Sequence, residues 1–456
     1  MPLSLYQRLF VSAKLILGFI FLSFSLIHGQ GAYLNVSAPS LTGESIRVNH
    51  PKGIILQVSE TSFSKIDSSG NLIIHVYPET YEIIQLAYGD AFLDVILQNG
   101  DSVEVFWNKE NKTWDYQRSS PLNTQADSLN SQVNAWLMKL AYSRNSAESN
   151  AFIQIKLDSL KTTGLKNPDD FLSIYQFYAA ADLDFMLGKS SFKDLSSFYF
   201  KNHTPKPFHP AWQYSFHSYY EGDVLKRLNQ ANSLELETAL KKANWNEIEQ
   251  TFMKDTSVSD TTFLPWLILK GVYDLSFTSK YPLQEFYRIL ENGLISNAGN
   301  SDISEEIDRI LKRWYPRIQG NEFPDFELFS ISRRKALKLS ELTKKPIYLV
   351  SLPDREANSL LLLKQVLSLQ KKYGSEIHFV AIIPSLEKEQ YEVFENYYGA
   401  IELIDFDSCK EEILSLFSEA DQPNFALIDK GFRTYLMPAE APETGVENSF
   451  LGLIKK

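Results

Sequence analysis

The chain has 456 residues, of which 44% are hydrophobic and 13% aromatic, so it has ample material for packed cores and is not disordered over most of its length. At this length two or three domains are expected. The formal net charge of −11 argues against nucleic acid as a partner, because phosphate binding requires a basic surface.

Residues 1–31 have the layout of a secretory signal peptide. Arg8 and Lys14 form a basic start, an apolar run follows over 15–27, and 28–31 supply small and polar residues as a cleavage zone. The alternative is an uncleaved anchor, but the apolar run is shorter than the ~20 residues that a spanning helix needs. We expect an exported bacterial protein, periplasmic or associated with the cell envelope, with no transmembrane span after cleavage.

Residues 32–120 have the pattern of a small all-β domain. Short runs that alternate apolar and polar residues occupy 53–58, 72–77 and 92–97, with turn-forming residues between them. The turn at 98–101 precedes another such run, which predicts a hairpin. Several short strands with regular turns predict a β-sandwich.

Residues 121–320 switch to a helical period, with apolar residues three and four apart. The expected helices are 127–140, 171–187, 212–228, 234–253, 263–277, 283–295 and 303–314. No 34-residue repeat with a fixed signature is present, so this region is predicted to be a helical domain, with a solenoid as the weaker alternative.

Residues 321–456 alternate strands and helices, which predicts a partly parallel sheet. The expected elements are a hairpin over 326–339, strands at 347–352, 378–383, 401–405, 425–428 and 435–437, and helices at 359–373, 386–397 and 409–417. The whole chain is therefore expected to be a multidomain α+β protein.

Three stretches of this last region carry a family resemblance. Residues 323–328 read Phe-Pro-Asp-Phe-Glu-Leu, 338–352 combine Lys-Leu-Ser-Glu-Leu with a buried strand, and 422–430 read Gln-Pro-Asn-Phe-Ala-Leu-Ile-Asp-Lys. In this order they resemble the TlpA/ResA-like branch of thioredoxin-fold thiol–disulfide oxidoreductases, which implies a thioredoxin-like α/β domain at 321–456. Residues 264–275 are similar to a helix of the long exported members, with the pattern "LvllKglyD".

The active-site loop departs from the family pattern. In the family, a C-x-x-C motif stands at the start of the helix that follows the first core strand, where the helix end lowers the thiol pKa. The corresponding residues of this chain are Asp354, Arg355, Glu356, Ala357, Asn358, Ser359 and Leu360. Ala357 and Leu360 fall at the two cysteine positions, and neither can ionise. The family's dithiol chemistry is therefore not expected.

A possible peptide groove is the part of the family's site that this chain retains. The resemblance makes Pro423 the counterpart of a cis-proline that lies beside the family's dithiol and leaves the preceding backbone free to pair with an extended substrate. Gln422 and Pro423 are thus candidates for a groove that binds a peptide by strand addition. The alternative is a turn that only begins a strand.

Cys409 is the one cysteine of the chain, so an internal disulfide cannot form. It stands at a predicted helix start, which favours a thiolate, but Asp405 and Asp407 oppose one. It is a weak redox candidate, and the alternative is a packing residue, since a free cysteine usually behaves as a small hydrophobe.

No metal or cofactor site is expected. His203, His209 and His217 are spaced so that no two share a helix face in the manner of a zinc-binding helix, and prolines interrupt the segment. The chain contains no glycine-rich phosphate loop of either common type.

The leading hypothesis is an exported thioredoxin-like protein without a redox dithiol, acting as a non-catalytic binding or scaffolding module with an envelope protein or peptide as partner. The alternative is a thiol–disulfide redox protein that works through Cys409 and a partner thiol. A third hypothesis places a ligand pocket between the β and helical domains.

Overall fold

The computed structural model describes residues 31–455 with short gaps, and every structural statement below concerns the described residues. The residues outside the description are 1–30, 52, 56–58, 79, 90, 143–145, 202, 229–233, 256–257, 259, 279–280, 343, 353–356, 385, 387, 410–411, 414–415, 418–422 and 456. The predicted signal peptide lies outside them almost entirely.

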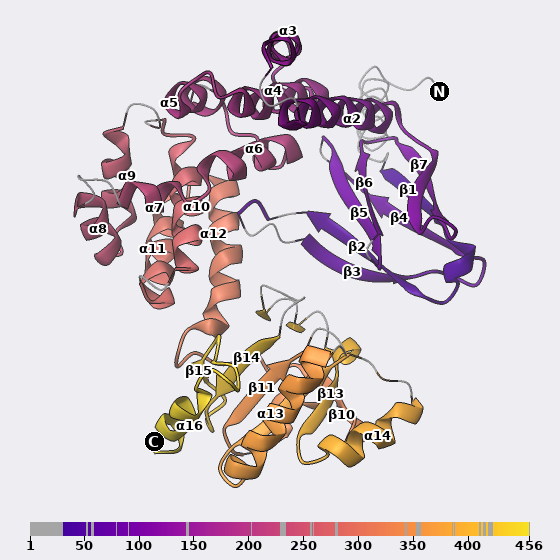
Figure 1. Ribbon diagram of the computed structural model, residues 1–456, viewed down its shortest axis with the longest axis vertical. Coiled ribbons are helices and arrows are strands. Elements are labelled where there is room, and N and C mark those ends of the chain that lie inside the picture. The colour runs from indigo at the N-terminus through magenta and orange to yellow at the C-terminus, as the bar shows by residue number, and fades with distance from the viewer. Residues whose placement is uncertain are drawn as a thin grey trace, which may run out of the picture. The chain divides into compact units, whose positions relative to one another are not determined.

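The chain is a mixed α/β protein that divides into two compact units. The first unit is Met1–Glu221 with Asp255–Leu264, and the second is Gly222–Lys254 with Pro265–Lys456. The division falls inside the helical region, so each unit combines helices with sheet (Figure 1).

Two four-stranded sheets open the first unit. Their orders are β4-β1-β7-β8 and β3-β2-β5-β6. The strands are β1 Ala32–Ser37, β2 Ser45–Pro51, β3 Ser59–Lys65, β4 Asn71–Val76, β5 Glu82–Tyr88, β6 Ala91–Leu97, β7 Ser102–Asn108 and β8 Thr113–Arg118. Alternate residues of both sheets, such as Leu34, Val105, Val48 and Ile84, are buried in one shared apolar core.

The turn at 98–101 does not close a hairpin, so that prediction was wrong. β6 pairs with β5, whereas β7 pairs with β1 and β8, and the chain crosses from one sheet to the other at this turn. Asp101 holds the turn, because its Oδ2 accepts the Gln98 N–H at 2.9 Å and its carbonyl accepts the Tyr33 N–H at 2.9 Å. The alternation of apolar and polar residues predicts both β6 and β7, but it does not show which strands they pair with.

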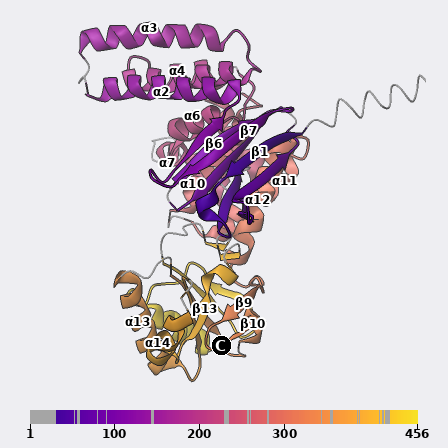
Figure 2. The same cartoon turned by 90° about the vertical axis from the view of Figure 1, so that its right-hand side faces the viewer.

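Helices complete the first unit. They are α2 Pro121–Tyr142, α3 Ala147–Gly164, α4 Phe171–Leu187, α5 Phe192–Ser196 and α6 Pro210–Tyr220. The sequence did not predict α3, which lies alongside α4 (Figure 2). Its buried stripe is thin, since Ile153, Leu157 and Leu160 stand between polar residues, and its start is marked by Ser146, whose side chain accepts the Ser149 N–H.

The second unit begins with α7 Asp223–Leu228, α8 Leu234–Lys241, α9 Trp245–Met253, α10 Leu264–Ser276, α11 Leu283–Ser296 and α12 Ser301–Trp314. Two predicted long helices are each broken into two. One break falls at Gly222, whose φ of +62° is left-handed, and the other at Ala243, whose φ is +51°. Asn244 then caps α9 by accepting the Glu247 N–H.

The C-terminal sheet has seven strands in the order β10-β9-β13-β12-β11-β14-β15. Its elements are β9 Glu327–Ser330, β10 Lys335–Lys338, β11 Ile347–Ser351, α13 Ala357–Tyr373, β12 His378–Ile383, α14 Lys388–Tyr398, β13 Glu402–Asp405, β14 Asn424–Ile428, β15 Thr434–Leu436 and α16 Val446–Ile454. β11, β12 and β13 are parallel, and β14 runs antiparallel to β11. The predicted hairpin, strands and partly parallel sheet are confirmed here.

Two apolar cores lie on the two faces of this sheet. Tyr348 and Val350 of β11 belong to the core that includes Leu363 of α13 and Phe450 of α16. Ile347 and Leu349 belong to the other core. The period of two along a strand sends successive side chains to opposite faces, so a residue's core tells which side of the sheet it occupies.

Candidate functional site at the carboxyl end of the central strand

The candidate site lies where β11 ends. β11 is buried along its whole length, and the next residue, Leu352, donates its N–H to Ile382 O at 2.9 Å. α13 begins at Ala357 and packs on the sheet beside β12 (Figure 1). Ser351, the last residue of β11, is the register partner of Asn424, the first residue of β14. The end of β11 and Pro423 therefore lie at the same edge of the sheet.

The loop residues predicted to replace the dithiol fall in two groups. Asp354, Arg355 and Glu356 lie outside the described residues. Ala357, Asn358, Ser359 and Leu360 form the first turn of α13, so the helix begins slightly earlier than predicted. Asn358 is exposed, Leu360 is partly buried, and Ser359 is only 3% exposed.

Packing on one face of the sheet joins β11 and β14 to the segment that follows β15. The rings of Tyr348 and Phe425 stack with their centroids 6.2 Å apart, and Tyr348 donates its hydroxyl hydrogen to Glu440 O at 2.8 Å. Phe425 O also accepts the Ala439 N–H at 2.9 Å. These contacts attach both strands to residues 439–440.

Pro423 is partly exposed, and Gln422 lies outside the described residues. The peptide bond that joins them is therefore not described. A cis bond is present further along, between Met437 and Pro438. The predicted peptide groove at Gln422 and Pro423 stays a prediction.

Cys409 is not part of this site. Its side chain is fully buried in the core that contains Ile347 and Leu349, on the opposite face of the sheet from Leu363 of α13. Desolvation raises the pKa of the Cys409 thiol to about 12, and Glu412, Asp405 and Asp407 add to this increase. The Cys409 sulfur lies 3.8 Å from Asp405 O, and a hydrogen bond with Ser408 partly opposes the increase in the pKa.

The three histidines of the first unit are engaged separately. His209 Nδ1 accepts the Ala211 N–H at 3.2 Å, Nε2 lies 3.0 Å from Phe171 O, and burial lowers the pKa of this imidazole to about 4. His217 Nε2 lies 2.6 Å from Ile54 O, and His203 packs on Phe177. The described residues contain no cluster of three or more potential metal-ligating side chains.

Sequence reasoning missed the roles of two charged residues in α10. Lys270 Nζ lies 2.6 and 2.8 Å from the two carboxylate oxygens of Asp274, and both side chains are mostly buried. Asp274 Oδ2 also accepts the Gly222 N–H at 3.2 Å, at the point where the predicted helix 212–228 breaks. The sequence contained a signal for this pair, because Lys270 and Asp274 are the two charged positions of the "LvllKglyD" pattern.

Comparison with known proteins finds similarity among solved structures only. No protein-family model and no curated protein matches the chain. A thioredoxin-like protein from Bacteroides caccae is 14% identical, with a TM-score of 0.35, over 58% of this chain and 95% of that chain. A proposed thiol-disulfide oxidoreductase from Bacteroides vulgatus is 18% identical, with a TM-score of 0.26, over 30% of this chain and 97% of that chain. A thiol:disulfide interchange protein from Bacteroides sp. is 10% identical, with a TM-score of 0.26, over 30% of this chain and 91% of that chain.

These three solved structures are a thioredoxin-like protein, a proposed thiol-disulfide oxidoreductase and a thiol:disulfide interchange protein. The identities and TM-scores are too low to transfer an activity. Among the described helices, none combines the length and apolar character needed to cross a bilayer.

Proposed function

We propose that this chain is an exported thioredoxin-like protein that serves as a non-catalytic binding or scaffolding module of the cell envelope. In this proposal a signal peptide at 1–31 precedes a β-sandwich domain at 32–120, a helical domain at 121–320 and a thioredoxin-like domain at 321–456. The observation that carries the proposal is the burial of Cys409, the only thiol, on the face of the sheet away from α13.

Dithiol chemistry requires two thiols that alternate between reduced and disulfide forms. The family resemblance places the two thiols at the positions of Ala357 and Leu360, and neither of these residues has a thiol. The site keeps its support, since β11, α13 and β14 pack on one apolar core. A retained strand–helix framework without its reactive groups fits a binding role better than a redox role.

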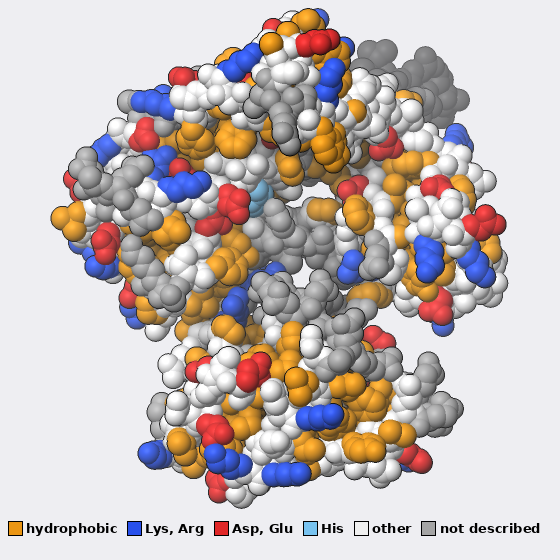
Figure 3. Space-filling model, in the orientation of Figure 1, with side chains coloured by type: hydrophobic (Ala, Val, Ile, Leu, Met, Phe, Trp, Pro, Cys, Tyr) orange, Lys and Arg blue, Asp and Glu red, His pale blue; other side chains and the backbone are white. Residues whose placement is uncertain are grey.

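The proposed partner is an envelope protein or an extended peptide that contacts the start of α13 and Pro423. Strand addition would supply main-chain hydrogen bonds without any chemistry. Basic and acidic side chains are interspersed on the face of the molecule in Figure 3, and this mixed surface together with the net charge of −11 supports a partner other than nucleic acid.

Cys409 is expected to be unreactive in the native protein. A buried thiol whose pKa is raised to about 12 is scarcely ionised at pH 8, so we expect its reaction with an aromatic disulfide reagent to be at least ~100-fold slower than in urea. The measurement is the absorbance of the released thiolate, with Cys409→Ser as the blank. If the thiol reacted at comparable rates in the native and unfolded protein, Cys409 would not be buried, and redox chemistry through Cys409 would become the favoured hypothesis.

Trapping in the native host separates the two functions. The tagged protein is acid-quenched, alkylated and run without reductant beside Cys409→Ser. We expect no partner band that depends on the thiol. A band that disappears in Cys409→Ser, or reduction of insulin by the purified mature chain, would overturn the non-catalytic proposal.

The binding role predicts a partner at the start of α13. A photo-crosslinking amino acid at the exposed Asn358 is expected to join the protein to an envelope protein or peptide in the native host. The matched control places the same amino acid at the exposed Lys430, which follows β14 at the other end of the strand. An identical set of products from both positions, or no product from Asn358, would count against a partner at this site.

A further inference from the structure

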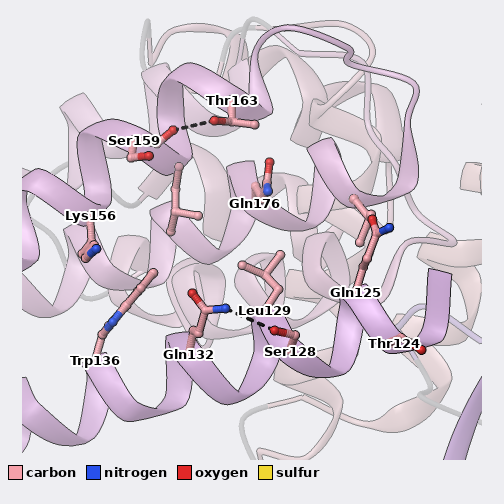
Figure 4. A pocket seen from close by; sticks show the side chains of 12 residues that line it. Thr124, Gln125, Ser128, Leu129, Gln132, Trp136, Lys156, Ser159, Thr163 and Gln176 are labelled. Atoms are coloured by element: carbon pink, nitrogen blue, oxygen red, sulfur yellow. Dashed lines mark hydrogen bonds between the residues drawn. The ribbon is translucent and has the colours of Figure 1, made fainter. Parts of the chain in front are cut away.

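A polar groove lies on the first unit between α2 and α3, with α4 as its floor (Figure 4). Its volume is about 550 Å³, within the range of about 300–1,000 Å³ that is usual for small-ligand sites. Leu129 and Gln132 of α2 and Gln176 of α4 point into the space between the helices. This groove is separate from the C-terminal site and does not depend on the function proposed for it.

The packing of the three helices explains why the groove stays open. α3 is pressed against α4 at Gly164, where an added Cβ would lie 2.8 Å from the backbone nitrogen of Phe177. α2 buries a narrow stripe, which includes Ala126, Val133 and Leu140. The neighbouring positions of α2 are left to line the groove instead of packing in the core.

The lining is polar but almost uncharged. Of its twelve described residues, seven have hydroxyl or carboxamide side chains, and the single charged residue is Lys156. The seven are Thr124, Gln125, Ser128, Gln132, Ser159, Thr163 and Gln176. The side chains of Gln125 and Gln176 have no hydrogen-bond partner among the described residues, although Gln176 is half-buried. These carboxamides offer donors and acceptors to a ligand.

An aromatic surface stands at one end of the groove. Trp136 of α2 is partly exposed there, and Lys156 Nζ of α3 lies 5.6 Å from its ring centroid. An indole ring has a flat apolar face and one N–H donor, so it can pack on a ligand that is apolar on one side and polar at its edge.

We propose that this groove binds a neutral carbohydrate, as a short stretch of a glycan chain. A sugar presents hydroxyl groups around its edge, which the carboxamides and hydroxyls can pair, and C–H groups on its face, which Trp136 can cover. An anion would require several cations, and the lining has one. A purely apolar ligand or an amphipathic helix would leave the carboxamides of Gln125 and Gln176 without partners.

The test is isothermal titration calorimetry of the mature protein with maltohexaose, cellohexaose and chitohexaose. At least one of these is expected to bind with a Kd between ~10 µM and 1 mM. Trp136→Ala and Gln176→Leu should each weaken binding at least ~10-fold, equivalent to about 1.4 kcal/mol. Asn134→Leu, which changes an exposed carboxamide on α2 outside the groove, should leave the Kd unchanged.

Folding of each variant is checked by circular dichroism, and Gln125→Leu replaces Gln176→Leu if the latter does not fold. The proposal is overturned if none of the three oligosaccharides binds at about 5 mM. It is also overturned if binding persists unchanged in Trp136→Ala and the carboxamide variant, or if a neutral peptide rich in serine and glutamine binds and the sugars do not.

Discussion

Replacement of Asp274 by alanine is expected to lower the free energy of unfolding by about 3–5 kcal/mol. The Lys270 side chain is 7% exposed and that of Asp274 is 21% exposed, so the variant leaves an ammonium group buried without its counter-charge. It also removes the acceptor of the Gly222 N–H. The measurement is urea-induced unfolding followed by far-ultraviolet circular dichroism.

Two variants control this result. Asp308→Ala breaks an i,i+4 ion pair with Lys312 that is largely exposed, and should cost less than about 1 kcal/mol. The double variant Lys270→Met with Asp274→Leu removes both buried charges and should recover most of the lost stability. It should remain about 1 kcal/mol less stable than the wild type, because the hydrogen bond to the Gly222 N–H is still missing. A cost below about 1 kcal/mol for Asp274→Ala would show that the pair is not effectively buried.

Replacement of Glu402 by glutamine is expected to cost about 2–3 kcal/mol at pH 7. The carboxyl group of Glu402 is buried at the start of β13, where it accepts hydrogen bonds from Ser330 Oγ and from Arg333 Nε and Nη2, the last two at 3.1 and 3.0 Å. The neutral amide keeps the shape but weakens these bonds. Arg333 is 34% exposed, which limits the loss.

This effect should depend on pH. Burial opposes ionisation of Glu402, but His378, Ser330 and Arg333 outweigh it and hold the pKa of the carboxyl below its usual value. A lowered native pKa adds stability above the unfolded-state pKa of ~4.3, and this stability is lost as the pH falls through the native value. The difference between wild type and Glu402→Gln should therefore be largest near pH 7 and shrink below about pH 4.

Urea unfolding at pH 7, 5 and 3.5 measures this dependence. Glu327→Gln is the control, because Glu327 is exposed on β9 and should change stability by less than about 0.5 kcal/mol at each pH. A Glu402→Gln deficit that is constant with pH would mean that the network is not held together by an ionised carboxylate.

Much of the C-terminal region was predictable from residues close together in the sequence. The strand at 378–383 matches β12, and the strand at 347–352 and the helix at 359–373 match β11 and α13 closely. These elements carry continuous apolar runs or a regular helical period, and their neighbours contain turn formers. The position of the candidate site at the start of α13 was implied by the family resemblance rather than by this pattern.

Elsewhere the local pattern was insufficient. Two predicted helices continue the helical period across Gly222 and Ala243, although each backbone turns there into a left-handed conformation. α3 buries too few apolar residues to stand out. The strand after the turn at 98–101 alternates as a hairpin partner would, and the choice of sheet depends on its pairing with β1, which is far from it in the sequence.

By itself the sequence determined what this protein lacks and which elements its C-terminal region forms. One cysteine in 456 residues excludes an internal dithiol whatever the fold, because disulfide exchange needs a second thiol. Only the tertiary structure decided where that cysteine lies. A thiol near a helix start can be exposed or buried, and burial depends on long-range packing of the sheet, which encloses Cys409 on the face away from α13. The groove between α2 and α3 could not be predicted from the sequence either, because it depends on how closely three helices approach one another.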